Sequence, residues 1–188
     1  MSGQRVCPWW LGYFLANPLR RLVQKPEKIL GPYVKDGMTV MDVGSAMGFF
    51  TLPLAKLVGD RGRVIAVDLQ EKMIRSLQRR AQRAGLGGRI ETRICSSTSL
   101  KIDDLAGSVD VALAFAVLHE MPDSAVAISS IAQSLKGGGL FLMAEPTGHV
   151  SAEGFRQASE VAFQQGLEIM TKPVIWHSHA LVLRKRLS

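Results

Sequence analysis

Short apolar runs alternate along the chain with segments whose apolar residues recur at helical spacing. The turn dipeptide Asp36-Gly37 precedes the first run, and Gly85 ends the second helical segment. In chain order these segments are strand 40–43, helix 49–58, strand 63–68, helix 71–84 and strand 90–95. Such alternation predicts an α/β fold.

The turn between the first strand and the first helix is rich in glycine. Gly44 and Gly48 stand there, and glycine permits both positive φ and close approach of a ligand to the backbone. The helix start adds unpaired N–H groups. A dinucleotide fingerprint, G-x-G-x-x-G, would need glycine where the chain has Ala46 and Phe49. This disfavours a nicotinamide-linked oxidoreductase.

The same turn resembles the D-x-G-x-G-x-G turn of class I S-adenosylmethionine-dependent methyltransferases. Asp42, Gly44 and Gly48 match that pattern, and Ala46 replaces its middle glycine. Asp68 ends the next strand about twenty residues further on, where such folds bind ribose hydroxyls. Two linked features in the right order favour this family.

The resemblance extends over residues 26–145. Residues 108–123 resemble the family's fourth strand with its following loop, and residues 136–146 resemble its fifth-strand element. A helix at 155–165 and strands at 167–174 and 180–184 follow. In this family such a final pair of strands closes the sheet as an antiparallel hairpin.

We therefore expect a Rossmann-like three-layer α/β sandwich with a mostly parallel seven-stranded sheet. The length of 188 residues and the hydrophobic fraction of 47% suit one globular domain. Residues 26–188 are expected to form the S-adenosylmethionine-binding domain, and residues 1–25 an aromatic N-terminal cap.

The resemblance also implies a binding site for S-adenosylmethionine and its product S-adenosylhomocysteine. Asp42 would lie near the methionine ammonium, Asp68 would accept the ribose hydroxyls, and Leu69 would pack on adenine. Ser96 stands where family members often carry Asp for the adenine amino group. The implied cofactor-binding residues are Asp42, Gly44, Ser45, Ala46, Gly48, Phe49, Asp68, Leu69, Ser96, Ser97, Phe115 and Leu118. The last two would wall the adenosyl and methyl groups.

Candidate catalytic residues follow the fourth strand. His119 and Glu120 stand at the edge where open sheets place ligands. Neutral His119 would serve a hydroxyl acceptor as general base, whereas amine and thiol acceptors do not need one. The alternative is that His119 only shapes the pocket. Glu145 and His149 are further candidates for the substrate pocket.

The N-terminal segment leaves three interpretations open. Trp9, Trp10 and Tyr13 belong to an amphipathic stretch that basic residues follow. It would pack on the sheet as an extra helix, cap the pocket so that these aromatics contact the acceptor, or lie on a membrane surface. Pro8 and the lack of a small-residue cleavage motif disfavour a signal peptide.

Charge and motifs bear on the partner. The net charge of +7 and the shared helical face of Arg75, Arg79 and Arg83 raise the question of nucleic acid. No aromatic residues alternate with these arginines, and the motifs typical of base and ribose methyltransferases are missing. A small-molecule acceptor is favoured. A nucleic-acid methyltransferase and a non-catalytic S-adenosylmethionine-binding module remain alternatives, and the oligomeric state stays open.

Cysteine and histidine usage adds two expectations. Cys7 and Cys95 are too few for a disulfide scaffold, so a reduced, cytoplasmic compartment is expected. His177 and His179 lack a third ligand at suitable spacing, so no metal site is expected.

Overall fold

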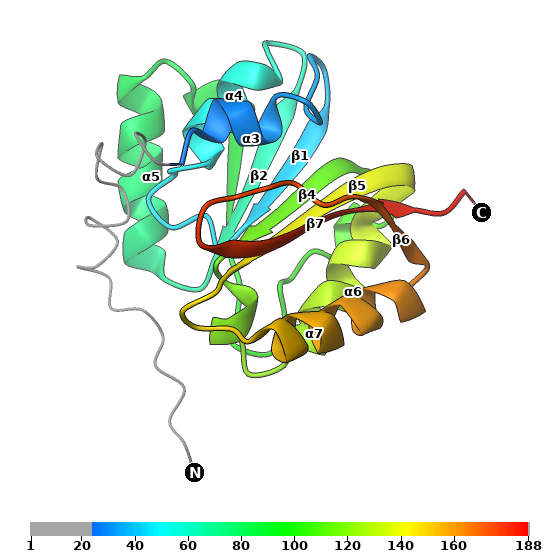
Figure 1. The fold of residues 1–188 in the computed structure, drawn as a ribbon. Coiled ribbons are helices and arrows are strands. Elements are labelled where there is room, and N and C mark those ends of the chain that lie inside the picture. The colour runs from blue at the N-terminus through cyan, green and yellow to red at the C-terminus, as the bar shows by residue number, and fades with distance from the viewer. Residues whose placement is uncertain (1–23, 188) are drawn as a thin grey trace.

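A twisted central sheet with helices on both faces forms the protein, as the computed structural model shows for residues 24–187 (Figure 1). The sheet has seven strands in the order β3-β2-β1-β4-β5-β7-β6. The strands are β1 (Thr39–Val43), β2 (Arg63–Asp68), β3 (Ile90–Ile94), β4 (Val109–Phe115), β5 (Leu135–Pro146), β6 (Leu167–Thr171) and β7 (Ser178–Lys185). Strands β1 to β5 pair in parallel, while β7 runs antiparallel to both β5 and β6. The predicted fold class is confirmed.

The helices divide between the two faces of the sheet. Strand alternation explains why, since Val40 and Val64 point to one face and Met41 and Ile65 to the other. The helices are α3 (Pro26–Leu30), α4 (Thr51–Leu57), α5 (Glu71–Arg83), α6 (Ser124–Ser134) and α7 (Ala152–Gln164). Helices α3 and α4 share the core of the first face, α6 and α7 share that of the second, and α5 packs against β2 and β3.

Among the element boundaries that differ from the sequence prediction, three have a clear local cause. The first helix begins at Thr51, because residues 46–50 are needed for the turn after β1. Helix α7 begins at Ala152, since the Ser151 hydroxyl accepts the Gly154 N–H at 3.1 Å and caps it. Strand β6 ends at Thr171, just before Pro173, which has no N–H for a sheet ladder.

The N-terminal prediction falls outside the described part of the chain. Trp9, Trp10 and Tyr13 lie among residues 1–23, so the cap within residues 1–25 stays a prediction. Within residues 24–187, none of the helices is long and apolar enough to span a bilayer.

Candidate functional site

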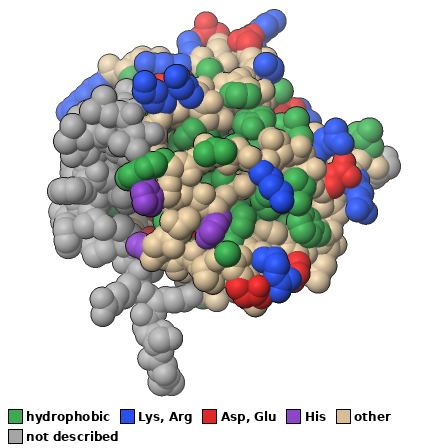
Figure 2. All heavy atoms as spheres, in the orientation of Figure 1, with side chains coloured by type: hydrophobic (Ala, Val, Ile, Leu, Met, Phe, Trp, Pro, Cys, Tyr) green, Lys and Arg blue, Asp and Glu red, His purple; other side chains and the backbone are tan. Residues whose placement is uncertain are grey.

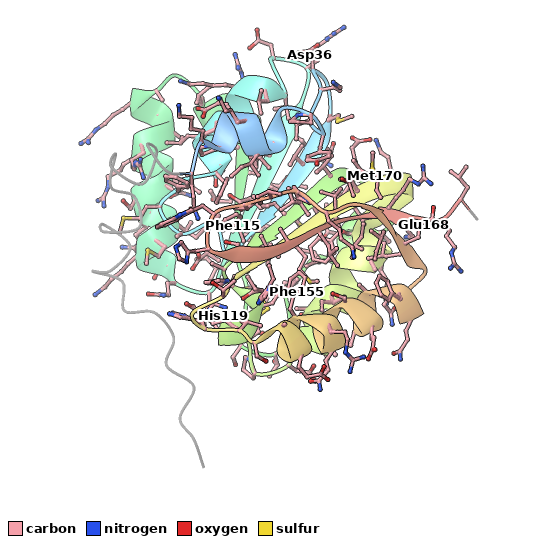
Figure 3. The ribbon with its side chains drawn as sticks, in the orientation of Figure 1. Asp36, Phe115, His119, Phe155, Glu168 and Met170 are labelled. Atoms are coloured by element: carbon pink, nitrogen blue, oxygen red, sulfur yellow. The ribbon has the colours of Figure 1, made fainter. Side chains whose placement is uncertain are left out.

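A cavity of about 400 Å³ opens at the carboxyl ends of the parallel strands. It is lined by the turn after β1, by residues 67–70 at the end of β2, by residues 115–117 at the end of β4 and by the loop before β7. In Figure 3, Phe115 and His119 lie at this same end of the sheet. An open α/β sheet binds ligands at this edge because the connections there diverge and leave a crevice.

Three alternate positions of the turn after β1 have left-handed backbone. The φ angles are +74° at Gly44, +45° at Ala46 and +86° at Gly48. A Cβ on Gly44 would lie 2.4 Å from Val117 Cγ2, and one on Gly48 would lie 2.4 Å from Leu77 Cδ1. Ala46 therefore follows the backbone path that its family pattern gives to glycine, at a cost of about 1–2 kcal/mol.

Asp68 ties this turn to the end of β2. Its two carboxylate oxygens accept the N–H groups of Ala46 and Gln70, each at 2.8 Å. Burial raises the pKa of Asp68, and these backbone hydrogen bonds partly oppose that shift. Each carboxylate oxygen can accept more than one hydrogen bond, so both remain able to accept a ligand hydroxyl.

Asp42 lies deeper and is almost completely buried. The Thr51 hydroxyl donates to its carboxylate at 2.6 Å. Burial raises the pKa of Asp42 to about 7, and the charge on Asp68 acts in the same direction. A cationic group bound in the cavity would favour the ionised carboxylate and lower this pKa.

The hydroxyl oxygen of Ser45 is a buried polar atom at the cavity wall. Its side chain is 4% exposed and lines the cavity. Among the described residues, its buried hydroxyl has no hydrogen-bond partner. Buried hydroxyls are normally satisfied, so a bound polar group is expected here.

These features together fit S-adenosylmethionine. Asp42 suits its ammonium, Ser45 suits a polar group of its methionine part, and Asp68 suits its ribose hydroxyls. The exposed side chain of Leu69 and the buried Met73 add apolar surface to the same cavity, which would suit an adenine ring. The cradle is close-fitting, because a Cβ at Gly44 would clash.

A histidine held by a buried carboxylate forms the opposite part of the site. Glu145, at the end of β5, is 2% exposed, and its Oε1 accepts the N–H groups of Val117 and Leu118 at 3.2 and 2.9 Å. Its Oε2 contacts Nδ1 of His119. An ionised carboxylate only accepts, so Nδ1 of His119 carries a proton, and in the neutral ring it is Nε2 that keeps the lone pair.

The pKa of His119 is raised by this arrangement. The hydrogen bond to Glu145 is the main cause, burial opposes it, and the charges of Glu145 and Glu120 contribute further. The neutral, basic form of His119 therefore predominates only above its ordinary titration range. The linked stability is fully present below the unfolded-state pKa and is lost as the pH rises through the folded-state pKa.

Most of the predicted site residues meet in the cavity. Those that line it are Asp42, Gly44, Ser45, Ala46, Phe49, Asp68, Leu69, Phe115, His119, Glu120 and His149. Three other predicted residues do not line it. Gly48 faces Leu77, Leu118 belongs to the core, and Glu145 acts through His119.

Ser96 and Ser97 are not brought to the cavity wall. The Ser96 hydroxyl accepts the Ser99 N–H at 3.1 Å and so closes its own loop. Cys95 and Leu100 line the cavity from this segment instead. The expected adenine contact of Ser96 has no support in this arrangement.

The loop before β7 supplies residues that sequence reasoning missed. Trp176, His177 and Ser178 line the cavity, and Trp176 is 62% exposed. The antiparallel pairing of Pro146 with Ser178 returns this loop to the carboxyl edge of β5. An exposed tryptophan in a hairpin loop was a signal, but the hairpin register was needed to place it. Figure 2 shows histidine side chains gathered on one part of this face.

Metal ligation is a separate matter. Across residues 24–187, no three side chains of His, Cys, Asp or Glu are grouped so as to hold a metal ion.

Comparison with known proteins places this site in a wider group. The family model described as "Methyltransferase domain" matches residues 34–177. The demethylmenaquinone methyltransferase of Desulfitobacterium hafniense is 28% identical over 149 residues, covering 78% of this chain and 56% of that protein. The UbiE ubiquinone/menaquinone biosynthesis C-methyltransferase of an Enterobacter species is 28% identical over 112 residues, covering 60% and 44%. The chain thus spans about half the length of these curated relatives.

Solved structures share the fold. A SAM-dependent methyltransferase from Aquifex aeolicus superposes with a TM-score of 0.84 over 95% of this chain and 99% of that one, at 21% identity. The [4+2]-cyclase SpnF superposes with a TM-score of 0.72 over 87% of this chain and 82% of that one, at 17% identity. The second title describes a different reaction, so fold alone does not determine the chemistry.

The turn geometry predicts opposite effects for two small substitutions. Gly44→Ala should lower the free energy of unfolding by about 2 kcal/mol or more, because the new Cβ meets Val117 in left-handed backbone. Ala46→Gly should leave stability unchanged or raise it by up to about 1 kcal/mol. Glycine removes the strain of left-handed backbone, but it also loses more backbone entropy on folding than alanine does, so the two effects partly cancel. Urea unfolding of both variants is the measurement, and a clear loss of stability in Ala46→Gly would contradict the left-handed turn.

The raised pKa of Asp42 predicts a pH-dependent stability difference. As pH rises from 3.8, the ordinary pKa of an aspartate, to about 7, the unfolded state releases this proton before the folded state does, so stability is lost across that window. Asp42→Asn keeps the size of the side chain and an acceptor for Thr51 but cannot ionise. The cofactor-free variant should therefore be more stable than wild type at pH 8 and no more stable near pH 4. Urea unfolding at several pH values tests this, and a difference that does not change with pH would refute it.

Proposed function

The chain belongs to the methyltransferase domain family, and we propose that it transfers the methyl group of S-adenosylmethionine to a small, apolar acceptor that carries an ionisable hydroxyl group. Membership of this family confirms the predicted resemblance to class I methyltransferases and confirms S-adenosylmethionine as the cofactor. The observation that carries the proposal is one cavity lined by Asp42, Asp68 and His119, with the buried Glu145 in contact with the His119 ring.

The chain's own residues would orient the cofactor. Bound S-adenosylmethionine supplies a sulfonium-activated methyl group, so the protein needs mainly to align a nucleophile behind that carbon. Asp68 would accept both ribose hydroxyls, and the turn at 44–47 would hold the methionine part. Phe115 would wall the reacting end, where it already packs on Phe50 with ring centroids 4.6 Å apart.

His119 would act on the acceptor hydroxyl as general base. Its Nδ1–H is committed to Glu145, so Nε2 is the atom that accepts a proton. Glu145 fixes the ring because its other oxygen is held by two backbone N–H groups. Removal of the hydroxyl proton raises the electron density on the acceptor oxygen and on conjugated carbons, either of which can then attack the methyl group. This pair favours catalysis over the alternative of a module that only binds the cofactor.

The lining of the cavity and the relatives support the proposed acceptor class. Phe49, Met121 and Trp176 offer apolar and aromatic contact surface at the acceptor side. The relatives' names refer to ubiquinone and menaquinone, whose precursors are ring compounds that carry hydroxyl groups. We infer a planar ring for the acceptor, with product analysis to decide whether oxygen or carbon is methylated.

Nucleic acid receives less support as acceptor. The helical face that carries Arg75, Arg79 and Arg83 belongs to α5. On it, Arg75 forms an ion pair with Glu71 at 2.7 Å. Exposed helical pairs of this kind are ordinary surface features. A cytoplasmic location and the membrane contact of residues 1–25 stay predictions.

Calorimetry with S-adenosylmethionine and S-adenosylhomocysteine tests the cofactor site. Asp68→Ala should weaken binding of both at least about tenfold, because ribose loses its charged acceptor. Leu69→Ser should also weaken binding, and it leaves the Ala46 N–H contact of Asp68 intact. Asp103→Ala, which removes an exposed carboxylate away from the cavity, is the matched control. If neither ligand binds wild type, the proposed function fails.

Transfer of labelled methyl to a panel of phenols and hydroquinones tests the acceptor class. His119→Asn keeps a donor for Glu145 but lacks Nε2, so transfer should fall roughly 10²–10⁴-fold while cofactor affinity is retained. In wild type the rate should rise with pH through the raised pKa of His119 and then level off, because only neutral His119 accepts a proton. Transfer to amines or thiols alone, or an undiminished rate in His119→Asn, would contradict the assigned role.

A further inference from the structure

Two histidines from different elements meet at the edge of the cavity. His119 lies in the short helix η3 (Leu118–Glu120) after β4, and His149 lies in the loop after β5. Nδ1 of His149 is 3.3 Å from Nε2 of His119. The rings stand almost perpendicular, with centroids 5.3 Å apart and an interplanar angle of 84°. The atom of His119 that the proposed function uses as base is therefore the atom that faces His149.

The two rings differ in their access to solvent. The side chain of His119 is 19% exposed, whereas His149 is an exposed residue. The loop that carries His149 is anchored, because Pro146 carbonyl oxygen accepts the N–H groups of His149 and Val150 at 3.0 and 2.9 Å. The geometry thus joins a mostly buried base to solvent through one neighbouring ring.

We propose that His149 is the exit for the acceptor's proton, a relay that resets His119 to its neutral form after each methyl transfer. The inference rests on the proposed function, since it concerns the same base. His149 contacts His119, so it is a positioning and relay residue rather than a catalytic one.

A proton acceptor next to His119 matters because the pKa of His119 is raised, although burial partly opposes that shift. Glu145 from β5 and Glu120 from η3 both favour the imidazolium form. The other titratable groups of the cavity are His177 from the loop before β7, Cys95 after β3, and Asp42 and Asp68 beside the turn. Within the described part of the chain, His149 is the ring that comes within hydrogen-bond distance of Nε2.

The proposed proton transfers need no reactant other than the acceptor, the two histidines and water. The acceptor O–H bond breaks as an N–H bond forms at Nε2 of His119, while Nδ1–H stays with Glu145. Once the methylated acceptor no longer holds that N–H, the Nε2–H bond breaks as an N–H bond forms at Nδ1 of His149. The His149 imidazolium then loses its Nε2 proton to water, and proton exchange with water moves the remaining proton from Nδ1 back to Nε2, so that Nδ1 can accept again. The net change is one proton moved from the acceptor to solvent.

The test is an NMR titration of the histidine ring signals in the full, cofactor-free chain. In wild type the imidazolium of His119 donates from Nε2 to His149. In His149→Phe that acceptor is lost, so the titration midpoint of His119 should fall by about half a pH unit or more. His149→Asn offers a side-chain oxygen near the former Nδ1 and should restore a midpoint close to wild type. His177→Asn removes another imidazole from the same cavity and should leave the midpoint of His119 unchanged.

The outcomes separate the relay from the proposed function. A fall in His149→Phe with restoration in His149→Asn supports the relay. An unchanged midpoint in His149→Phe overturns it, and so does a rise, because a rise means that His149 acts on His119 as a like charge. Amide spectra confirm that each variant is folded. Since no methyl transfer is involved, failure of the relay leaves cofactor binding intact, whereas failure of the proposed function appears in the calorimetry.

Discussion

The contact between the Asp68 carboxylate and the Ala46 N–H is the constraint on which the site depends. This hydrogen bond, 2.8 Å long, joins the ends of two adjacent parallel strands and holds the turn in its left-handed course. The same course brings Ser45 and Gly44 to the cavity wall and places Asp42 beneath it. Burying these two carboxylates is costly; the Thr51 hydroxyl and two backbone N–H groups offset part of that cost, and a bound cation or ligand hydroxyls would offset more of it. The turn is thus built for a ligand that brings both.

The other half of the site, Glu145 with His119, also contains a buried carboxylate, but here groups of the protein itself satisfy it. Glu145 is buried at a strand end, but two backbone N–H groups and the His119 ring satisfy its oxygens. A carboxylate satisfied in this way is rigid, and it determines which nitrogen of His119 carries the proton. Near the turn after β1, the buried Ser45 hydroxyl has no hydrogen-bond partner among the described residues. The His119–Glu145 pair, by contrast, is already hydrogen-bonded in the free protein.

Local pattern predicted much of the fold and the cofactor half of the site. The strand-turn-helix around Gly44 and the acid at Asp68 are encoded within a short stretch, so the local pattern together with the family resemblance located them. Long-range register was harder to predict. Trp176 reaches the cavity only because β7 pairs antiparallel with β5, and no nearby residue signals that register. The hydroxyl of Ser96 accepts the Ser99 N–H within its own loop, and residue type and position alone do not indicate that contact.

The most direct measurement is a crystal structure of the chain with S-adenosylhomocysteine bound. The ribose hydroxyls should lie on the Asp68 carboxylate, adenine against Leu69, and the sulfur toward Phe115 and His119. That placement would join both halves of the site around one reacting atom. A ligand bound elsewhere, or reversed so that its amino acid end lies against Leu69, would contradict the central claim that the turn and the histidine serve a single methyl transfer.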